Sequence, residues 1–302
     1  MSRNEISTRQ LRLWTLLAET AALSHYGGGG YMAAALAAGA LLPLNLLFGD
    51  GFHRMGKAAS FLEWGWAVAV LAHLLSGAGA YWPGNGSALA VPLVLLALAA
   101  MAGGKEKAAR AGSTLFWLAG VMLLGVALAA VSQIQVEWLV PVPGEWTAGL
   151  IVSLLLPSLA SALLPGCGKA KTVLWTGVIA VAAAAILQGT LCASVAMGED
   201  APLFELGRGL GNGGYEILVS TVATLGWYAL TSLLFEASAV FAEQWGMEKQ
   251  SGRSLSFGAA AIGLVLGMKL DGRILTGGCL LMWILIPMLH PKNKMKKDEK
   301  RC

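Results

Sequence analysis

Few ionisable side chains lie within the long apolar stretches of this sequence, and these are the residues that could do chemistry. They are Glu19, Glu63, His73, Glu216 and Glu236. An ionisable side chain in hydrocarbon is costly, so each one indicates a partner, a cavity or a pathway. Glu63 and Glu236 are close enough to segment ends to reach interfacial water. Glu19 and His73 are the candidates for proton coupling, with structural pairing as the alternative.

A polar stripe follows one face of the apolar segment 217–242. Its members recur at steps of three and four residues and are Glu216, Ser220, Thr224, Trp227 and Thr231. At about 100° per residue they share one side of a helix. Because hydroxyls are unsatisfied in lipid, we expect this face to point toward other helices or water. The stripe either binds a ligand or joins helices through hydrogen bonds between them, each of which contributes about 0.6 kcal/mol.

Pro157 is a candidate helix breaker in the middle of an apolar segment. Proline has no amide proton, so the carbonyl of Ser153 loses its partner within the helix. Transporters place substrates at broken helices, where freed carbonyls coordinate the ligand. A kink used only for packing is the alternative.

Residue patterns typical of enzymes and metal sites are missing from the sequence. The four cysteines share no spacing that suits zinc, an iron–sulfur cluster or a redox pair, and there are only four histidines. The G-x-G-x-x-G of residues 209–214 follows no predicted strand, which excludes a dinucleotide site. Gly263 and Gly267 have the spacing typical of close helix packing. We therefore predict no enzyme activity, no catalytic residues, no metal and no cofactor.

The composition identifies the kind of element that must position these residues. Charged residues make up 13% of the 302, against about 25% in soluble domains. Hydrophobic residues make up 56%, mean hydropathy is +0.66, and there are 11 tryptophans. A water-soluble fold cannot bury so much apolar surface. We predict an all-α, polytopic integral membrane protein and exclude disordered, collagenous and disulfide-rich classes.

About ten apolar stretches can be recognised, which we assign to a single transmembrane domain covering residues 1–302. They are 11–26, 29–49, 61–82, 88–103, 113–133, 146–164, 172–197, 217–242, 254–268 and 274–289, followed by a basic tail, 290–302. Several are shorter than the roughly 20 residues that a span needs, so tilted, broken or re-entrant helices are included in the count.

The lysines and arginines give an orientation. With the N-terminus inside, all of them fall in cytoplasmic segments except Arg208, Lys269 and Arg273. Both termini are then cytoplasmic. The net charge of +4 is concentrated in the tail, so we expect no nucleic-acid partner. Glu19 interrupts the first segment and no A-x-A site follows, which argues against a cleaved signal peptide.

Three motifs, in order along the chain, carry a family resemblance. They comprise residues 5–11, an I-S-x-R-Q-like phrase; residues 104–110, G-x-E-x-x-A-R, with L-x-P within 135–141; and residues 202–208, P-x-x-E-L-x-R, followed by Gly211, Glu216 and Trp227. In these motifs the chain resembles the endospore germination permeases. These are the B subunits of germinant receptors, within the amino acid–polyamine–organocation superfamily.

The resemblance implies a LeuT-like transporter fold of two inverted five-helix repeats, with broken first and sixth helices framing a small-molecule site. The residues that would converge there to bind the ligand are Glu19, Thr20, Ser153, Pro157, Glu216, Ser220, Thr224 and Trp227. The resemblance also implies a location in the bacterial cytoplasmic membrane or the spore inner membrane, and partner subunits of the A and C types.

Three functions follow as hypotheses. The first is a germinant-receptor subunit that binds an amino-acid-like germinant and signals to its partner subunits. The second is a secondary transporter that moves an amino acid or other organic solute with a proton, for which Glu19 or His73 would be the titrating group. The third is a membrane scaffold without a ligand, which the small number of buried polar groups would suit.

Overall fold

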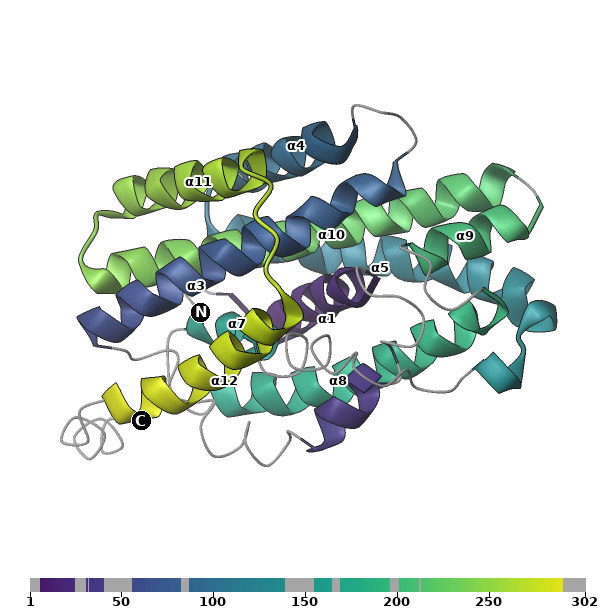
Figure 1. Ribbon diagram of the computed structural model, residues 1–302, viewed down its shortest axis with the longest axis horizontal. Coiled ribbons are helices and arrows are strands. Elements are labelled where there is room, and N and C mark those ends of the chain that lie inside the picture. Colours follow the sequence, from purple (N-terminus) through teal and green to yellow (C-terminus); the bar gives the residue numbers. More distant parts are fainter. Residues whose placement is uncertain are drawn as a thin grey trace.

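In the computed structural model, the residues described are 6–24, 31, 33–40, 56–82, 87–138, 155–164, 169–195, 201–211 and 213–289. Over these residues the secondary structure is entirely helical, with turns between helices and no strand. Most of the helices run along the long axis of the molecule (Figure 1). The all-α prediction is therefore confirmed for the described part of the chain.

In the described part of the chain, four helices are long and apolar enough to cross a membrane, which is compatible with a membrane location. They are α3 (Lys57–Ser76) continued by η2 (Gly77–Tyr81), α5 (Lys105–Ala130) continued by η3 (Val131–Gln133), α8 (Lys169–Leu191), and α10 (Gly213–Trp245). Each covers most of one of the predicted apolar stretches. The larger count of about ten spans stays a prediction.

The remaining described α-helices are shorter or less apolar. They are α1 (Thr8–Ser24), α4 (Ser87–Met101), α7 (Leu156–Ala162), α9 (Pro202–Gly209), α11 (Lys249–Val265) and α12 (Gly272–Leu289). Residues 31 and 33–40 of the predicted segment 29–49 are helical as well. The predicted segment 146–164 is described only from residue 155, and the basic tail lies outside the described residues.

Helix α9 lies between two predicted apolar stretches and matches neither of them. It is strongly amphipathic: Pro202, Leu203 and Leu206 are buried, whereas Arg208 is exposed. Helices α10 and α11 also begin before their apolar stretches, at Gly213 and Lys249. Hydropathy marks the apolar part of a helix, and polar turns that continue it carry no such signal.

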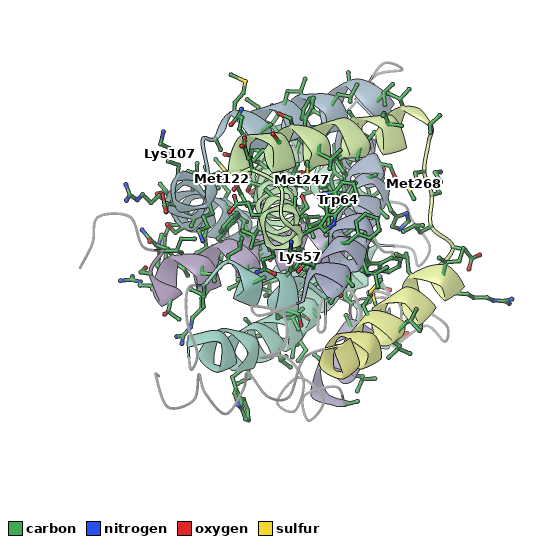
Figure 2. The ribbon with its side chains drawn as sticks, turned by 90° about the vertical axis from the view of Figure 1, so that its left-hand side faces the viewer. Lys57, Trp64, Lys107, Met122, Met247 and Met268 are labelled. Atoms are coloured by element: carbon green, nitrogen blue, oxygen red, sulfur yellow. The ribbon has the colours of Figure 1, made fainter. Side chains whose placement is uncertain are left out.

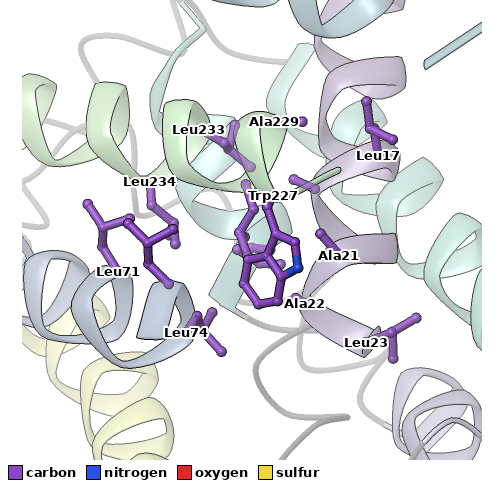
Figure 3. Packing of buried hydrophobic residues seen from close by; sticks show 14 of the residues in the cluster. Leu17, Ala21, Ala22, Leu23, Leu71, Leu74, Trp227, Ala229, Leu233 and Leu234 are labelled. Atoms are coloured by element: carbon purple, nitrogen blue, oxygen red, sulfur yellow. The ribbon is translucent and has the colours of Figure 1, made fainter. Parts of the chain in front are cut away.

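Helix α10 is the centre of the bundle, with α1, α3, α5 and α11 packed around it. Trp227 is buried on it and projects toward α1 and α3, among Ala22, Leu71 and Leu74 (Figure 3). The indole nitrogen of Trp14, on α1, donates to the Ala229 carbonyl at 3.0 Å and to the Ser232 hydroxyl at 3.1 Å. These contacts join α1 to α10 over much of their length.

Small residues allow the helices to approach closely. A Cβ on Gly112 of α5 would overlap the Trp14 indole, and one on Gly226 of α10 would lie 3.0 Å from the Ala21 Cβ. Gly263 contacts α3 in the same way, since its Cβ would lie 2.9 Å from that of Ala72. Gly267, however, lies beyond the end of α11 with φ at +65°, so the predicted packing role is wrong for this member of the pair.

A buried ion pair joins three helices at one end of the bundle. Arg253 of α11 donates to both carboxylate oxygens of Glu236 on α10, each at 2.7 Å, and to the Ala100 carbonyl of α4 at 3.1 Å. The exposed fraction of Glu236 is 2% and that of Glu63 is 0%. The prediction that these two carboxylates reach interfacial water is therefore wrong, because neighbouring helices cover both.

Basic residues gather at this same end. Helix α3 begins beside the end of α10, where the Ser60 hydroxyl donates to the Gln244 side chain at 3.3 Å, and α11 begins beside the end of α4. The first residues of α3, α5 and α11 are all lysines. Figure 2 views this end, with α10 nearly end on, Lys57 and Met247 close to it, and Lys107 pointing away from the bundle.

Candidate functional site

The site that the structure builds around a predicted residue is a cavity of about 260 Å³ between α1 and α8. Helix α1 supplies most of its wall, ending at Glu19, and α8 supplies the facing wall. Successive turns of α1 line it because residues three and four apart share one face of a helix. Its lining residues are Arg9, Arg12, Leu13, Thr15, Leu16, Glu19, Thr176, Gly177 and Ala180.

Glu19 is the deepest charged group in this cavity. Its exposed fraction is 0%, and neither carboxylate oxygen has a hydrogen-bond partner in the part of the chain that is described. Buried polar atoms in folded proteins are almost always paired, and an unpaired one costs about 1–3 kcal/mol or more when it is charged. An unpaired carboxyl that lines a cavity is thus available to a ligand or a proton.

Gly177 allows three helices to meet at Glu19. A Cβ on Gly177 would lie 3.1 Å from the Pro157 Cβ and 3.6 Å from the Glu19 Oε1 atom. Pro157 is in the first turn of α7, and Leu155 before it is in π-helical conformation. The structure therefore brings together Glu19 and Pro157, whereas Ser153 and the rest of the predicted break lie outside the described residues.

Two arginines give the cavity a second charge. Arg9 and Arg12 line it seven or more residues before Glu19, about 10 Å along the axis of α1 at 1.5 Å per residue. Arg9 is exposed and Arg12 is half-buried. The cavity thus has a guanidinium region near the start of α1 and a carboxyl at depth. A ligand that carries both a negative and a positive group matches this arrangement.

Thr20 lies beside this cavity and lines a different one, of about 370 Å³, between α1, α5 and α8. The two cavities share Leu16 and Ala180. The Thr20 hydroxyl donates to the Leu16 carbonyl at 2.9 Å, and its own carbonyl accepts from the Gln188 side chain at 3.0 Å. Apart from Thr20, this second cavity is lined by apolar residues and Gly120.

The polar stripe does not converge on Glu19. Glu216, Ser220 and Thr224 line a third cavity, which shares no residue with the Glu19 cavity. Trp227 lines neither of them and belongs to the buried core. The convergence that the sequence predicted is wrong for these residues, because the stripe is longer than one site and its turns contact different neighbours.

The expectation that the stripe must face inward to satisfy its hydroxyls is also wrong for its threonines. Thr224 donates to the Ser220 carbonyl at 2.7 Å, and Thr231 donates to the Trp227 carbonyl at 2.7 Å. A threonine in a helix can satisfy its own hydroxyl proton on the preceding turn. Its burial is then set by packing: Thr231 is buried, whereas Thr224 is half-buried.

His73 lies apart from all three cavities. Its Nδ1 atom accepts a hydrogen bond from the Leu270 amide at 3.2 Å, and the side chain is 9% exposed. This contact ties the segment between α11 and α12 to α3. A ring nitrogen that accepts from the backbone has a structural role, so Glu19 is the stronger candidate for proton coupling.

Glu63 is a second carboxyl with the same burial as Glu19. Its exposed fraction is 0%, and both oxygens lack a hydrogen-bond partner among the described residues. It lies on α3 and lines none of the three cavities. Glu19 and Glu63 are thus equally buried, but of the two only Glu19 lines one of the three cavities described.

Among the residues that line the Glu19 cavity, sequence reasoning identified Glu19 and missed the others, including Arg9, Arg12, Thr176 and Gly177. The two arginines were used only as markers of orientation, although their spacing from Glu19 places them on its side of α1. Nothing in the sequence indicates that Gly177 faces Pro157, because that contact joins residues distant in the chain. Among the described residues, no group of three or more His, Cys, Asp or Glu could hold a metal ion.

Comparison of the chain with known protein families and with curated proteins finds no match.

Proposed function

We propose that this chain is the membrane subunit of a spore germinant receptor, binding a small amino-acid-like germinant and signalling to subunits of the A and C types. In this proposal the chain has about ten transmembrane helices in two inverted five-helix repeats and lies in the spore inner membrane. The observation that carries the binding role is Glu19, a fully buried carboxyl without a hydrogen-bond partner among the described residues, at the end of a cavity.

The charges around this cavity favour a zwitterion. Glu19 can accept hydrogen bonds from an ammonium group, and Arg12 can donate to a carboxylate. The two lie on the same side of α1 with a cavity of about 260 Å³ between them. A small amino acid presents both groups, whereas an anion or a neutral sugar leaves one of these charges without a counterpart.

The surroundings of Glu19 suit a transporter-type fold. Pro157, in the first turn of α7, lies next to Gly177, which also faces Glu19, and Leu155 before it is in π-helical conformation, so the helix is irregular at this point. Substrate sites near such irregular turns are typical of this fold. The motifs in residues 5–11, 104–110 and 202–208 support the assignment to the germination permeases.

Germination of spores from the host tests this function. Spores that lack the gene are complemented with the wild-type chain, with Glu19→Gln or with Glu63→Gln, and dipicolinate release is recorded against a panel of amino acids. We expect the deletion and Glu19→Gln to abolish the response to one class of germinant, and Glu63→Gln to restore it. Unchanged germination of the deletion spores would contradict the receptor role.

A proton-coupled transporter of amino acids is the second candidate, which the unpaired Glu19 carboxyl favours because such a group can exchange a proton. Counterflow of a labelled amino acid in proteoliposomes separates the two functions. A transporter accumulates label and loses this activity in Glu19→Gln, whereas a receptor subunit binds the amino acid without moving it.

A further inference from the structure

The third cavity lies at the end of the bundle away from the lysines that begin α3, α5 and α11. It has a volume of about 370 Å³ and is formed by α9, by the first turns of α10 and by Trp82, which follows η2. Its walls reach the surface, where Trp82 is 44% exposed and Ile217 is 68% exposed. Small-molecule sites have volumes of about 300–1,000 Å³, so this cavity is large enough for an organic ligand.

The hydrogen-bonding groups that line this cavity are nearly all acceptors. Thr221 donates its hydroxyl proton to the Ile217 carbonyl at 2.8 Å, and Thr224 donates to the Ser220 carbonyl at 2.7 Å. With both protons committed to the helix backbone, each hydroxyl oxygen can only accept from a ligand. Ser220 is the one lining hydroxyl, among the described residues, whose proton is not used in this way.

Glu216 adds a negative charge to these acceptors. It has no ion pair or hydrogen bond with another residue in the part of the chain that is described, and its carboxylate accepts but does not donate. Glu205, the acidic residue of α9, differs because it forms an ion pair: the Arg208 Nη1 atom lies 3.6 Å from its Oε1 atom. Glu216 is therefore the unneutralised charge of this cavity.

Two aromatic rings complete the lining. Trp82 and Phe204 line the same cavity as Glu216. Aromatic faces attract cations through the ring quadrupole, most strongly for tryptophan. A carboxylate, acceptor oxygens and aromatic rings together match an ammonium group attached to an apolar body.

Other ligand classes fit this lining less well. An anion would face the Glu216 carboxylate and hydroxyl oxygens that can only accept, with the Ser220 hydroxyl and the Trp82 indole N–H as the lining donors. A calcium ion takes about six to eight oxygen ligands, and the broad apolar and aromatic wall leaves too few. The geometry points to a binding site for organic ammonium groups, separate from the Glu19 cavity because the two share no residue.

The ammonium can come from a free amine or from a phosphatidylethanolamine headgroup. Binding is tested on the full-length protein in nanodiscs of phosphatidylglycerol, by calorimetric titration with phenethylammonium. Its neutral isostere 2-phenylethanol and its anionic analogue 3-phenylpropionate are titrated in parallel. We expect phenethylammonium to bind at least about tenfold more tightly than either, because only it pairs with Glu216.

Matched variants locate the binding. Glu216→Gln is expected to weaken phenethylammonium binding about tenfold or more, whereas Glu205→Gln removes a charge from the same end of the molecule and leaves the affinity unchanged. Phenethylammonium binding that persists in Glu19→Gln and is lost in Glu216→Gln belongs to this cavity, which separates it from the proposed germinant site. Circular dichroism and gel filtration establish that each variant is folded.

A second lipid composition identifies the source of the ammonium. Weaker apparent affinity in nanodiscs that contain phosphatidylethanolamine assigns the site to the lipid headgroup, and equal affinity assigns it to a free amine. The proposal is overturned if phenethylammonium does not bind in phosphatidylglycerol nanodiscs, if 2-phenylethanol binds equally well, or if Glu216→Gln binds as the wild type does.

Discussion

At the scale of single residues, three carboxyls are buried in the described part of the chain, and they differ in whether a cation pairs with them. Glu236 has both oxygens on Arg253, which also lies over the Phe235 ring at 5.0 Å. Glu19 and Glu63 have no hydrogen-bond partner within the described structure. Burial alone does not distinguish them, so the partner is what separates a structural carboxylate from one available for function.

Removal of one partner of the buried pair is expected to be strongly destabilising. Arg253→Met leaves Glu236 uncompensated and should lower the free energy of unfolding by about 3–5 kcal/mol. Replacing both residues with methionine should recover most of this loss, because no charge is then left buried alone. Unfolding in mixed detergent micelles measures both variants. A double variant as unstable as Arg253→Met would show that the pair does not act as a unit.

At the scale of elements, helix α5 tests how close packing depends on glycine. Gly112→Ala places a methyl group against the Trp14 indole and should destabilise the protein by about 1–3 kcal/mol. Gly120, two turns along the same helix, has open space where a Cβ would be, so Gly120→Ala is the matched control. Thermal unfolding in detergent compares them, and equal midpoints would contradict the packing described for α1 and α5.

The sequence predicted those elements whose signal lies in hydropathy. Helices α3, α5, α8 and α10 each cover most or all of a predicted apolar stretch. Helix α9 was missed because it has eight residues and its signal is amphipathic rather than apolar. Gly263 was predicted correctly as a packing residue, whereas Gly267 is in the turn after α11, where its positive φ matters.

The candidate site was predictable only in part. An acidic residue within an apolar segment indicates a partner, a cavity or a pathway, and this signal identified Glu19 and Glu216 but also Glu236, which pairs with Arg253. Which residues share a cavity depends on the neighbours of each turn. The turns of α10 at Glu216 and at Trp227 contact different elements. Residues on the same face of this helix therefore lie in different surroundings: Glu216 lines a cavity, and Trp227 is in the core.

At the scale of the whole molecule, the charges at the two ends predict an orientation. Lysines begin α3, α5 and α11 at one end, and α9 with Arg208 lies at the other. The positive-inside rule places the lysine end in the cytoplasm. In a chain whose cysteines are replaced by alanine, Lys107→Cys should react with an impermeant maleimide only in inverted vesicles. Arg208→Cys should react in right-side-out vesicles, and the reverse pattern would contradict the orientation.

The central claim, that Glu19 ends a binding site for an amino-acid-like ligand, is tested most directly by ligand-induced thermal stabilisation of the purified protein. Wild type, Glu19→Gln and Glu63→Gln are heated with each member of an amino-acid panel. The account predicts that one class of amino acids raises the melting temperature of the wild type and of Glu63→Gln, and leaves that of Glu19→Gln unchanged. Equal stabilisation of Glu19→Gln, or no stabilisation of the wild type by any amino acid, would contradict it.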